Sequence, residues 1–495
     1  MTAKPPAAPL SNVAPAPWST WSAGERESFF EAIARHRQAA WRVTLASGTA
    51  NTVVAVIVAT LMAPLFYGTL ALALDVINIA VPAPNLIASI MSALGPAMDA
   101  PETISVGRWL QLLVFAAIPG LIWMGVVVLS LRRMLRLSAS FDAGEMAARA
   151  PNVTVLAEQQ FGNVIGEMAI AANIPPPRVL IVDRPVQNAA VFGRDEQHAT
   201  VVISQGLLER LDRAEMQGIA AHLIGSIANA DMGIGLRAAV TISLFSLVAY
   251  LGTVLVKGTG AFRKLARILR AAVMPTAAGA RELAMELADP FADTDPPESK
   301  PESPVPSSGP QTPWEKVRPF LWLPLAGPLV MSGFFGGVVS LFVLGPLLAL
   351  AWRQRKYMAD ATAVRLTRDP NTLSEALQKM SAAGDGVAFA PWTAHLSVVQ
   401  LGHSQSKLMG GGAVPMFPSL ERRLRALGKL GAQMTTAPRK MPLRVVLIIG
   451  PLFAIVAVLV AIMLPLMVWL SLALTMLMTA LPLGIVHALL RWIGH

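Results

Sequence analysis

A single histidine stands in the middle of the apolar stretch Ala214–Asp231, whose sequence is AEMQGIAAHLIGSIANAD. Its rhythm is that of the helical motif H-E-x-x-H, in which two His at i and i+4 reach one zinc ion. The Glu beside the first His then acts as general base on the metal-bound water. Here His222 keeps the first ligand position, Leu223 occupies the position of the base, and Ser226 occupies the second ligand position.

The elements that must position this helix precede it in the chain. Phe161–Asn173 has the pattern of an amphipathic helix, and the short apolar runs Arg178–Val182 (RVLIV) and Thr200–Ile203 (TVVI) predict two strands. Between these strands lies Pro185–Gly193. Taken alone, His222 is best explained as a hydrogen-bonded core histidine, so the case for an active-site helix depends on the rest of the chain.

Composition places the chain in a membrane. Of its 495 residues, 54% are hydrophobic and 14% are charged, and its mean hydropathy is +0.54, whereas soluble domains carry about 25% charged residues. The net charge of +10 is typical of cytoplasmic loops and contact with anionic lipid. No clusters of base-stacking aromatic residues favour nucleic acid as a partner. The absence of Cys excludes disulfides and thiolate metal sites.

Apolar runs predict an α-helical multi-pass protein of about six spans, built around a soluble domain that the spans split in two. One crossing is expected near 46–74, an exposed loop at Pro82–Gly107, and a second crossing at Trp109–Leu131. The predicted units are a disordered N-terminus with a juxtamembrane helix (1–42), a transmembrane pair (43–131), the first part of the soluble domain (138–235), a transmembrane hairpin with an amphipathic helix and a Pro-rich linker (236–352), the second part of the soluble domain (353–440) and a closing transmembrane pair (443–492).

Basic residues at the ends of the apolar runs predict that both soluble blocks face the cytoplasm. Within the predicted hairpin, Phe262–Val273 has apolar residues on one face and Arg or Lys on the others. Such a helix suits an anionic membrane surface, although a helix packed on the soluble domain would show the same pattern.

Several segments around the His222 helix share an order that resembles a known family. They are IPPPRVLIVD (174–183), QNAAVFG (187–193), VVISQGLLERL (201–211), RQRKYMADA (353–361) and MFPSLERRL (416–424). Together with the helix, they resemble the membrane zinc metallopeptidases of the HtpX and CAAX-prenyl-endopeptidase family over roughly residues 150–432. The resemblance implies a zincin-like α+β domain that faces the cytoplasm of a bacterial inner membrane.

The same resemblance implies that the active site is degenerate. The third zinc ligand of the family, a Glu, falls on Lys356, and the His of its T-H-P element falls on Phe417. Asp360 is kept, and in the family such an Asp supports a ligating His. Since a zinc site needs about three protein ligands, His222 beside an ammonium does not make one. We expect a vestigial site of His222, Ser226, Lys356 and Asp360, with Leu223 and Phe417 at the former catalytic positions, and neither metal nor catalysis.

Two further expectations concern charge at this site. Lys356 should point toward the vacated metal position and pair with Asp360 or another acid, because its ammonium replaces part of the lost positive charge. A rebuilt metal centre would instead need new donors beside His222, for which Glu215, Asp231 and Glu196 are the candidates.

These features predict a catalytically inactive metallopeptidase homologue that binds or regulates membrane-protein clients in quality control or envelope stress. One alternative is an active zinc metalloendopeptidase with substituted ligands, which would require zinc. Another is a membrane transporter, although the chain shows no internal repeat and few ionisable residues inside its spans. The expected partners are membrane-protein segments and anionic lipid.

Overall fold

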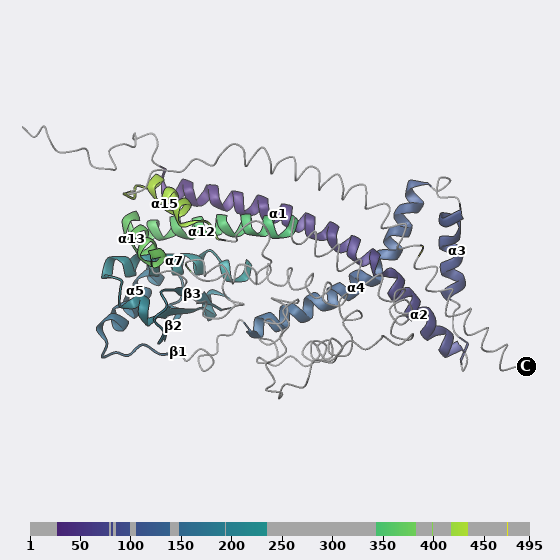
Figure 1. Cartoon of the computed structure of the whole chain (residues 1–495), viewed down its shortest axis with the longest axis horizontal. Coiled ribbons are helices and arrows are strands. Elements are labelled where there is room, and N and C mark those ends of the chain that lie inside the picture. Colours follow the sequence, from purple (N-terminus) through teal and green to yellow (C-terminus); the bar gives the residue numbers. More distant parts are fainter. Residues whose placement is uncertain are drawn as a thin grey trace, which may run out of the picture.

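The computed structural model describes residues 27–78, 81–82, 86–99, 105–138, 148–193, 195–234, 343–382, 398, 417–433 and 473. It comprises a hairpin of long apolar helices and an α+β domain, with helix α1 shared between them (Figure 1). The predicted span at 237–256, the basic helix at 262–273 and the linker at 290–313 lie outside the described residues, as does the closing pair at 443–492 apart from residue 473.

Helix α1 (Phe29–Leu61) starts at a capping box in which the Ser28 hydroxyl accepts from the Phe30 N–H and Glu31 accepts from the Ser28 N–H. Its 33 residues rise about 50 Å at 1.5 Å per residue, well beyond the hydrocarbon thickness of about 30 Å. The predicted juxtamembrane helix and the first crossing are therefore one continuous helix, whose basic N-terminal part extends out of the apolar region.

The hairpin continues through α2 (Ala63–Asn78) and α3 (Leu86–Asp99) and returns in α4 (Val106–Ser138). The prediction of an exposed loop at Pro82–Gly107 was wrong, because α3 lies within it. Its Ile90 and Leu94, one turn apart, are fully buried against Tyr67 and Leu112. The i, i+4 spacing of these two residues indicates a helix. The prediction missed it because Pro96 lies within the segment and Pro is unusual inside a helix.

Helices α1 and α4 pack closely and run antiparallel. A Cβ on Gly120 would lie 2.6 Å from the Cα of Ala59, so the absence of a side chain lets the two backbones approach. Further along, the Tyr67 hydroxyl donates to the Phe115 carbonyl at 2.6 Å.

Two of the described helices, Phe29–Leu61 and Val106–Arg133, are long and apolar enough to cross a membrane. Most of their apolar surface is open rather than packed inside the protein; Leu45, Val53, Val114, Ile122 and Leu129 are all exposed. Apolar residues in the core of a soluble protein would be covered, so this open apolar surface is typical of helices in a membrane. The chain is a membrane protein with a helix-and-sheet domain outside the bilayer.

The sheet of that domain has four strands in the order β1-β2-β4-β3. Strands β2 (Arg178–Val182) and β4 (Thr200–Ser204) are parallel, with Arg178 opposite Thr200, which confirms the two strands predicted from the apolar runs. At one edge β3 (Ala189–Phe192) runs antiparallel to β4, and at the other β1 (Ala148–Arg149) pairs with β2.

Helices cover this sheet and enclose α7, the helix that carries His222. The helices of the domain are α5 (Leu156–Ala172), the 3-10 turn η4 (Glu196–His198), α6 (Gln205–Leu208), α7 (Arg213–Ala228), α12 (Gly345–Thr367), α13 (Pro370–Ala382) and α15 (Leu420–Lys429). Helix α7 packs against α5, α12 and α13. The two predicted halves of the soluble domain thus meet along α7, with α1 lying beside α12 (Figure 1).

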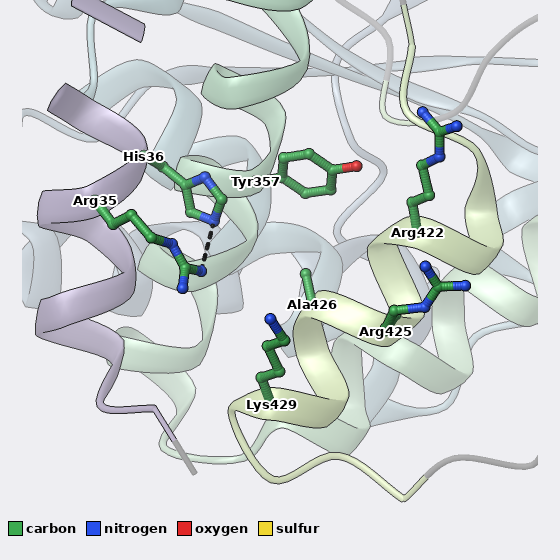
Figure 2. A pocket seen from close by; sticks show the side chains of 7 residues that line it. All are labelled: Arg35, His36, Tyr357, Arg422, Arg425, Ala426 and Lys429. Carbon is green, nitrogen blue, oxygen red and sulfur yellow. Dashed lines mark hydrogen bonds between the residues drawn. The ribbon is translucent and has the colours of Figure 1, made fainter. Parts of the chain in front are cut away.

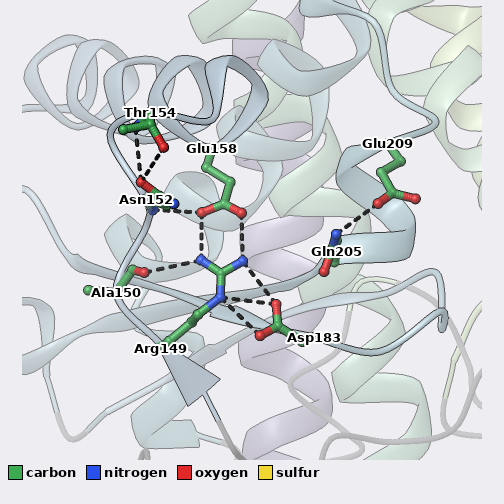
Figure 3. A network of polar contacts seen from close by, with 8 residues as sticks. All are labelled: Arg149, Ala150, Asn152, Thr154, Glu158, Asp183, Gln205 and Glu209. Carbon is green, nitrogen blue, oxygen red and sulfur yellow. Dashed lines mark hydrogen bonds and ion pairs between the residues drawn. The ribbon is translucent and has the colours of Figure 1, made fainter.

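Arg149 fastens the short β1 strand to the rest of the domain (Figure 3). Its guanidinium donates to both carboxylate oxygens of Glu158 on α5 at 2.7 Å, and its Nε donates to Asp183 at 2.9 Å. The buried Glu158 also accepts from the Asn152 N–H at 2.6 Å. These contacts hold the entry to α5 against the end of β2.

Gly218 on α7 tests how tightly the two halves meet. A Cβ there would lie 2.6 Å from the Leu373 N atom of α13, so we expect Gly218→Ala to push the helices apart and destabilise the protein by about 1–3 kcal/mol. At Gly166 on α5 a Cβ meets nothing within 4 Å, and Gly166→Ala should stabilise by about 0.5–1 kcal/mol. Thermal unfolding in detergent measures both. Equal melting temperatures for the two variants would show that α7 and α13 can separate freely.

Candidate functional site

Helix α7 starts at the cap residue Asp212, whose side chain accepts from the Glu215 N–H at 2.9 Å while Glu215 accepts from the Asp212 N–H at 2.9 Å. The helix has no solvent-facing stripe: its residues from Glu215 to Ile227 are buried with the single exception of Gln217. This all-round apolar character suits a helix enclosed by others. His222 is consequently 0% exposed.

The buried carboxylate of Asp360 on α12 joins three helices. Its Oδ1 lies 2.8 Å from Nδ1 of His222 on α7. The guanidinium of Arg423 on α15 contacts the same carboxylate twice, with Nη2 2.6 Å from Oδ1 and Nε 2.9 Å from Oδ2. His222 approaches off the line of a well-directed hydrogen bond, so the two-pronged Arg423 contact dominates.

Arg423 also links this group to the edge of the sheet. Its Nη1 donates to the Val398 carbonyl at 2.6 Å, and the Val398 N–H donates to the Ala189 carbonyl of β3 at 2.9 Å. Polar contacts therefore run from His222 through Asp360 and Arg423 to the outer edge of β3. An extended peptide that added to the edge of β3 would need the backbone carbonyl of Ala189. Val398 of the chain itself already donates to this carbonyl.

Lys356 lies inside the protein with an exposed fraction of 2%. Its Nζ is 5.4 Å from the ring centroid of Phe417 and 5.7 Å from that of Trp352. Both aromatic faces attract a cation at such distances. The residues at the family's third-ligand and T-H-P positions thus contact each other, an ammonium against a phenyl ring.

A second buried ion pair stands beside the first. Arg355 on α12 contacts Asp231 through its Nε at 2.5 Å and also donates to the Asn229 carbonyl. Asp231 is one of the acids considered for a rebuilt metal centre, but it is bound by this guanidinium. Glu215 is likewise engaged, 2.6 Å from Nζ of Lys379, and Glu196 lies in η4.

Burial and charge set the protonation states here. Burial lowers the pKa of His222 to about 4, with Arg423 and Lys356 acting in the same direction. Burial lowers the pKa of Lys356 to about 8 against the opposing effect of Asp231. Burial alone would raise the pKa of Asp360, but the Arg423 guanidinium and His222 outweigh it and hold that pKa well below its usual range. A neutral imidazole therefore sits beside a carboxylate that is already compensated by a guanidinium.

The residues present do not fit a zinc ion. His222 contributes one imidazole, Ser226 has replaced the second ligand, and the third position carries the ammonium of Lys356, which repels a dication. Leu223 beside His222 offers no atom that could accept a proton. Over the described part of the chain, no three or more His, Asp or Glu side chains gather in a metal-binding group.

Sequence reasoning missed three residues that contact the charged side chains of this site. Arg423, Arg355 and Trp352 were not singled out, although Arg423 lies in the MFPSLERRL segment on which the resemblance was based. The available signal was the pairing of that Arg with the retained Asp360: a carboxylate kept in an apolar helix needs a cation. The structure brings His222, Ser226, Lys356, Asp360 and Phe417 into one region, as the resemblance implied.

Comparison with known proteins supports that resemblance. Residues 156–289, which include all of α7, match the family model of Peptidase family M48. A protein named Protease HtpX homolog from Ligilactobacillus salivarius is 27% identical over 281 residues, covering 54% of this chain and 70% of that protein. The protein of the same name from Dictyoglomus turgidum is 29% identical over 279 residues, covering 54% and 68%. No solved structure matches the chain. The chain thus resembles the HtpX family of membrane metallopeptidases.

The free-energy cost of burying the Lys356 ammonium can be measured from the pH dependence of protein stability. Its pKa falls from 10.5 unfolded to about 8 folded, so the unfolded chain binds more protons between these values and stability rises with pH across this window. At pH 7 the full cost is present. Because Asp231 and Asp360 keep their own guanidinium partners, we expect Lys356→Met to stabilise at pH 7, by at most about 3 kcal/mol. This gain should disappear by about pH 11.

The matched control is Lys379→Met on α13, which should lower the melting temperature because it removes the ammonium that pairs with the buried Glu215. Thermal unfolding in detergent between pH 7 and 10 measures both variants. A lower melting temperature for Lys356→Met at pH 7 would show that the ammonium is needed to compensate the buried acids.

Proposed function

We propose that this protein is a catalytically inactive metallopeptidase homologue that binds or regulates membrane-protein clients in quality control or envelope stress. The observation that carries the proposal is the buried ammonium of Lys356 at the third-ligand position, packed against Phe417 where a His would stand. Burying a charge is costly, and this ammonium stands where a catalytic metal would need an anionic ligand. Arg423 meanwhile supplies the positive charge that Asp360 requires.

Client binding is supported by what the fold retains. The domain keeps its sheet, the enclosed α7 and an α1 helix that extends from the domain into an apolar hairpin. Such a molecule holds a folded surface beside the bilayer, where segments of other membrane proteins emerge. Loss of proteolysis with retention of this placement favours recognition without cleavage.

We further propose that the chain has about six spans in a bacterial inner membrane, with both soluble blocks on the cytoplasmic side. The support is the basic N-terminal part of α1, which includes the exposed Arg37 and Arg42, together with Arg132 and Arg133 on α4. Basic residues at membrane ends favour the cytoplasm.

Inactivity predicts that the purified full-length protein holds no stoichiometric zinc and binds denatured casein without cutting it, equally well with and without a chelator. The comparison is a variant with four substitutions, Leu223→Glu, Ser226→His, Lys356→Glu and Phe417→His, which restores the family's ligands and base. This variant should bind about one zinc ion per chain, since three protein ligands and an open position suffice. Elemental analysis and gel assays report both properties.

The same assays can contradict the proposal. One zinc per native chain, lost in His222→Ala, would establish an active centre with substituted ligands. Casein cleavage that a chelator stops would lead to the same conclusion. A native chain that neither binds nor cleaves casein or a membrane-protein segment would exclude the client-binding role while leaving the inactive site in place.

Topology is testable by reporter fusions at residues 20, 150, 400 and 495. All four should report a cytoplasmic location, because each lies on the basic side of an apolar run. A fusion between α2 and α3, near residue 84, should report the opposite side and serves as the control. A periplasmic signal at 150 or 400 would contradict the proposed orientation.

A further inference from the structure

A cavity of about 240 Å³ opens on the outer side of α15, where this helix meets α1 and α12 (Figure 2). Most of the side chains around it are basic. Those that matter for its chemistry are Arg35 and His36 of α1, Tyr357 of α12, and Arg422, Arg425 and Lys429 of α15. Among the described residues, no carboxylate is part of this lining.

Three basic residues of α15 lie on one face of the helix. Arg422, Arg425 and Lys429 follow the spacing i, i+3, i+7, so they lie along one side of the helix. Arg423, the residue directly after Arg422, instead points inward and contacts Asp360. On α12, likewise, Lys356 is enclosed at the vestigial site while Tyr357 lines the cavity. The cavity and the vestigial site therefore lie along neighbouring faces of the same two helices.

Nearby acids compensate only part of this charge. Glu27 lies 2.6 Å from Arg35, and Glu421 lies 2.9 Å from Arg425. The four Arg and Lys side chains of the lining thus exceed these acids by two positive charges.

His36 orients Arg35 rather than adding to the charge. Its Nδ1 is 2.7 Å from Oε1 of Gln354, and its Nε2 is 3.3 Å from Nη2 of Arg35. A Gln oxygen only accepts and a guanidinium only donates, so Nδ1 donates, Nε2 accepts, and the ring is neutral. The ring also stacks on Tyr357, with centroids 5.2 Å apart. Arg35 is thereby held at the mouth of the cavity (Figure 2).

The cavity lies close to where α1 enters the apolar region. Arg42 is the last charged residue before that region, seven residues after Arg35, which is roughly 10 Å along the helix. Lipid headgroups fill a layer of about 5–8 Å on each side of the hydrocarbon. The exposed Trp41 is typical of that boundary.

We propose that this cavity binds the phosphate group of an anionic ligand. Guanidinium groups suit phosphate because each can donate two parallel hydrogen bonds to its oxygens. Bound phosphate would neutralise the excess charge and accept from the Tyr357 hydroxyl. The headgroup of an anionic phospholipid and a free phosphate both carry this group, and the test below distinguishes the two sources. The proposal goes beyond the pseudopeptidase function and does not depend on it.

The test uses the full-length protein purified in a neutral detergent, with lipid binding followed by native mass spectrometry and by the rise in melting temperature. One arm adds phosphatidylglycerol, the second adds inorganic phosphate, and the third adds zwitterionic phosphatidylcholine as a reference. The variant Arg422→Gln with Lys429→Gln removes two cations from the cavity. Its matched control, Arg37→Gln with Arg42→Gln, removes two exposed cations of α1 that do not line it.

We expect phosphatidylglycerol binding to fall about tenfold or more in the cavity variant, since hydrogen bonds to charged groups are lost, and to change little in the control. Preference for phosphatidylglycerol identifies a headgroup site, whereas equal binding of inorganic phosphate identifies a soluble phosphate ligand. Equal losses in both variants, or no preference for either anion over phosphatidylcholine, would overturn the proposal. If the cavity variant melts without added ligand, Arg422→Gln with Arg425→Gln provides the second test.

Discussion

The carboxylate of Asp360 is the buried charge around which the domain is arranged. It lies at 1% exposure where α7, α12 and α15 meet, and each helix contributes to its surroundings. A buried carboxylate without a partner would cost several kcal/mol, and here Arg423 supplies two contacts while His222 supplies one. The two halves of the split domain are therefore joined by compensated charges, with Asp360 among them, as well as by apolar packing.

The side chains at the family's zinc-ligand positions set the charge balance of this interior. The Lys356 ammonium at a former ligand position faces the acids Asp231 and Asp360, which have guanidinium partners of their own. The aromatic rings of Trp352 and Phe417 then surround its charge. Each of these three charges therefore has an oppositely charged or aromatic neighbour.

Sequence reasoning predicted the elements whose pattern is local. The strands β2 and β4 followed from short apolar runs, and α7 followed from the spacing around His222. It could not place Arg423 on Asp360, because 63 residues separate them and only the fold brings α15 to α12. Helix α3 was missed since Pro96 and small residues dilute its apolar period. The sequence did not predict that the juxtamembrane helix and the first crossing form the single helix α1. The sequence changes from charged to apolar near Arg42, and the prediction placed the end of a helix at this change.

Adjacent residues on α12 and α15 point from different faces of these helices, so the same two helices contribute to the cavity and to the His222 site. Lys356 and Arg423 face inward, whereas Tyr357 and Arg422 line the cavity. A ligand that contacts Arg422 and Tyr357 would bind the same two helices that carry Arg423 and Asp360. Close-packed helices move as units rather than deforming residue by residue. Polar contacts of α15 reach the edge of the sheet by way of Arg423, Val398 and Ala189.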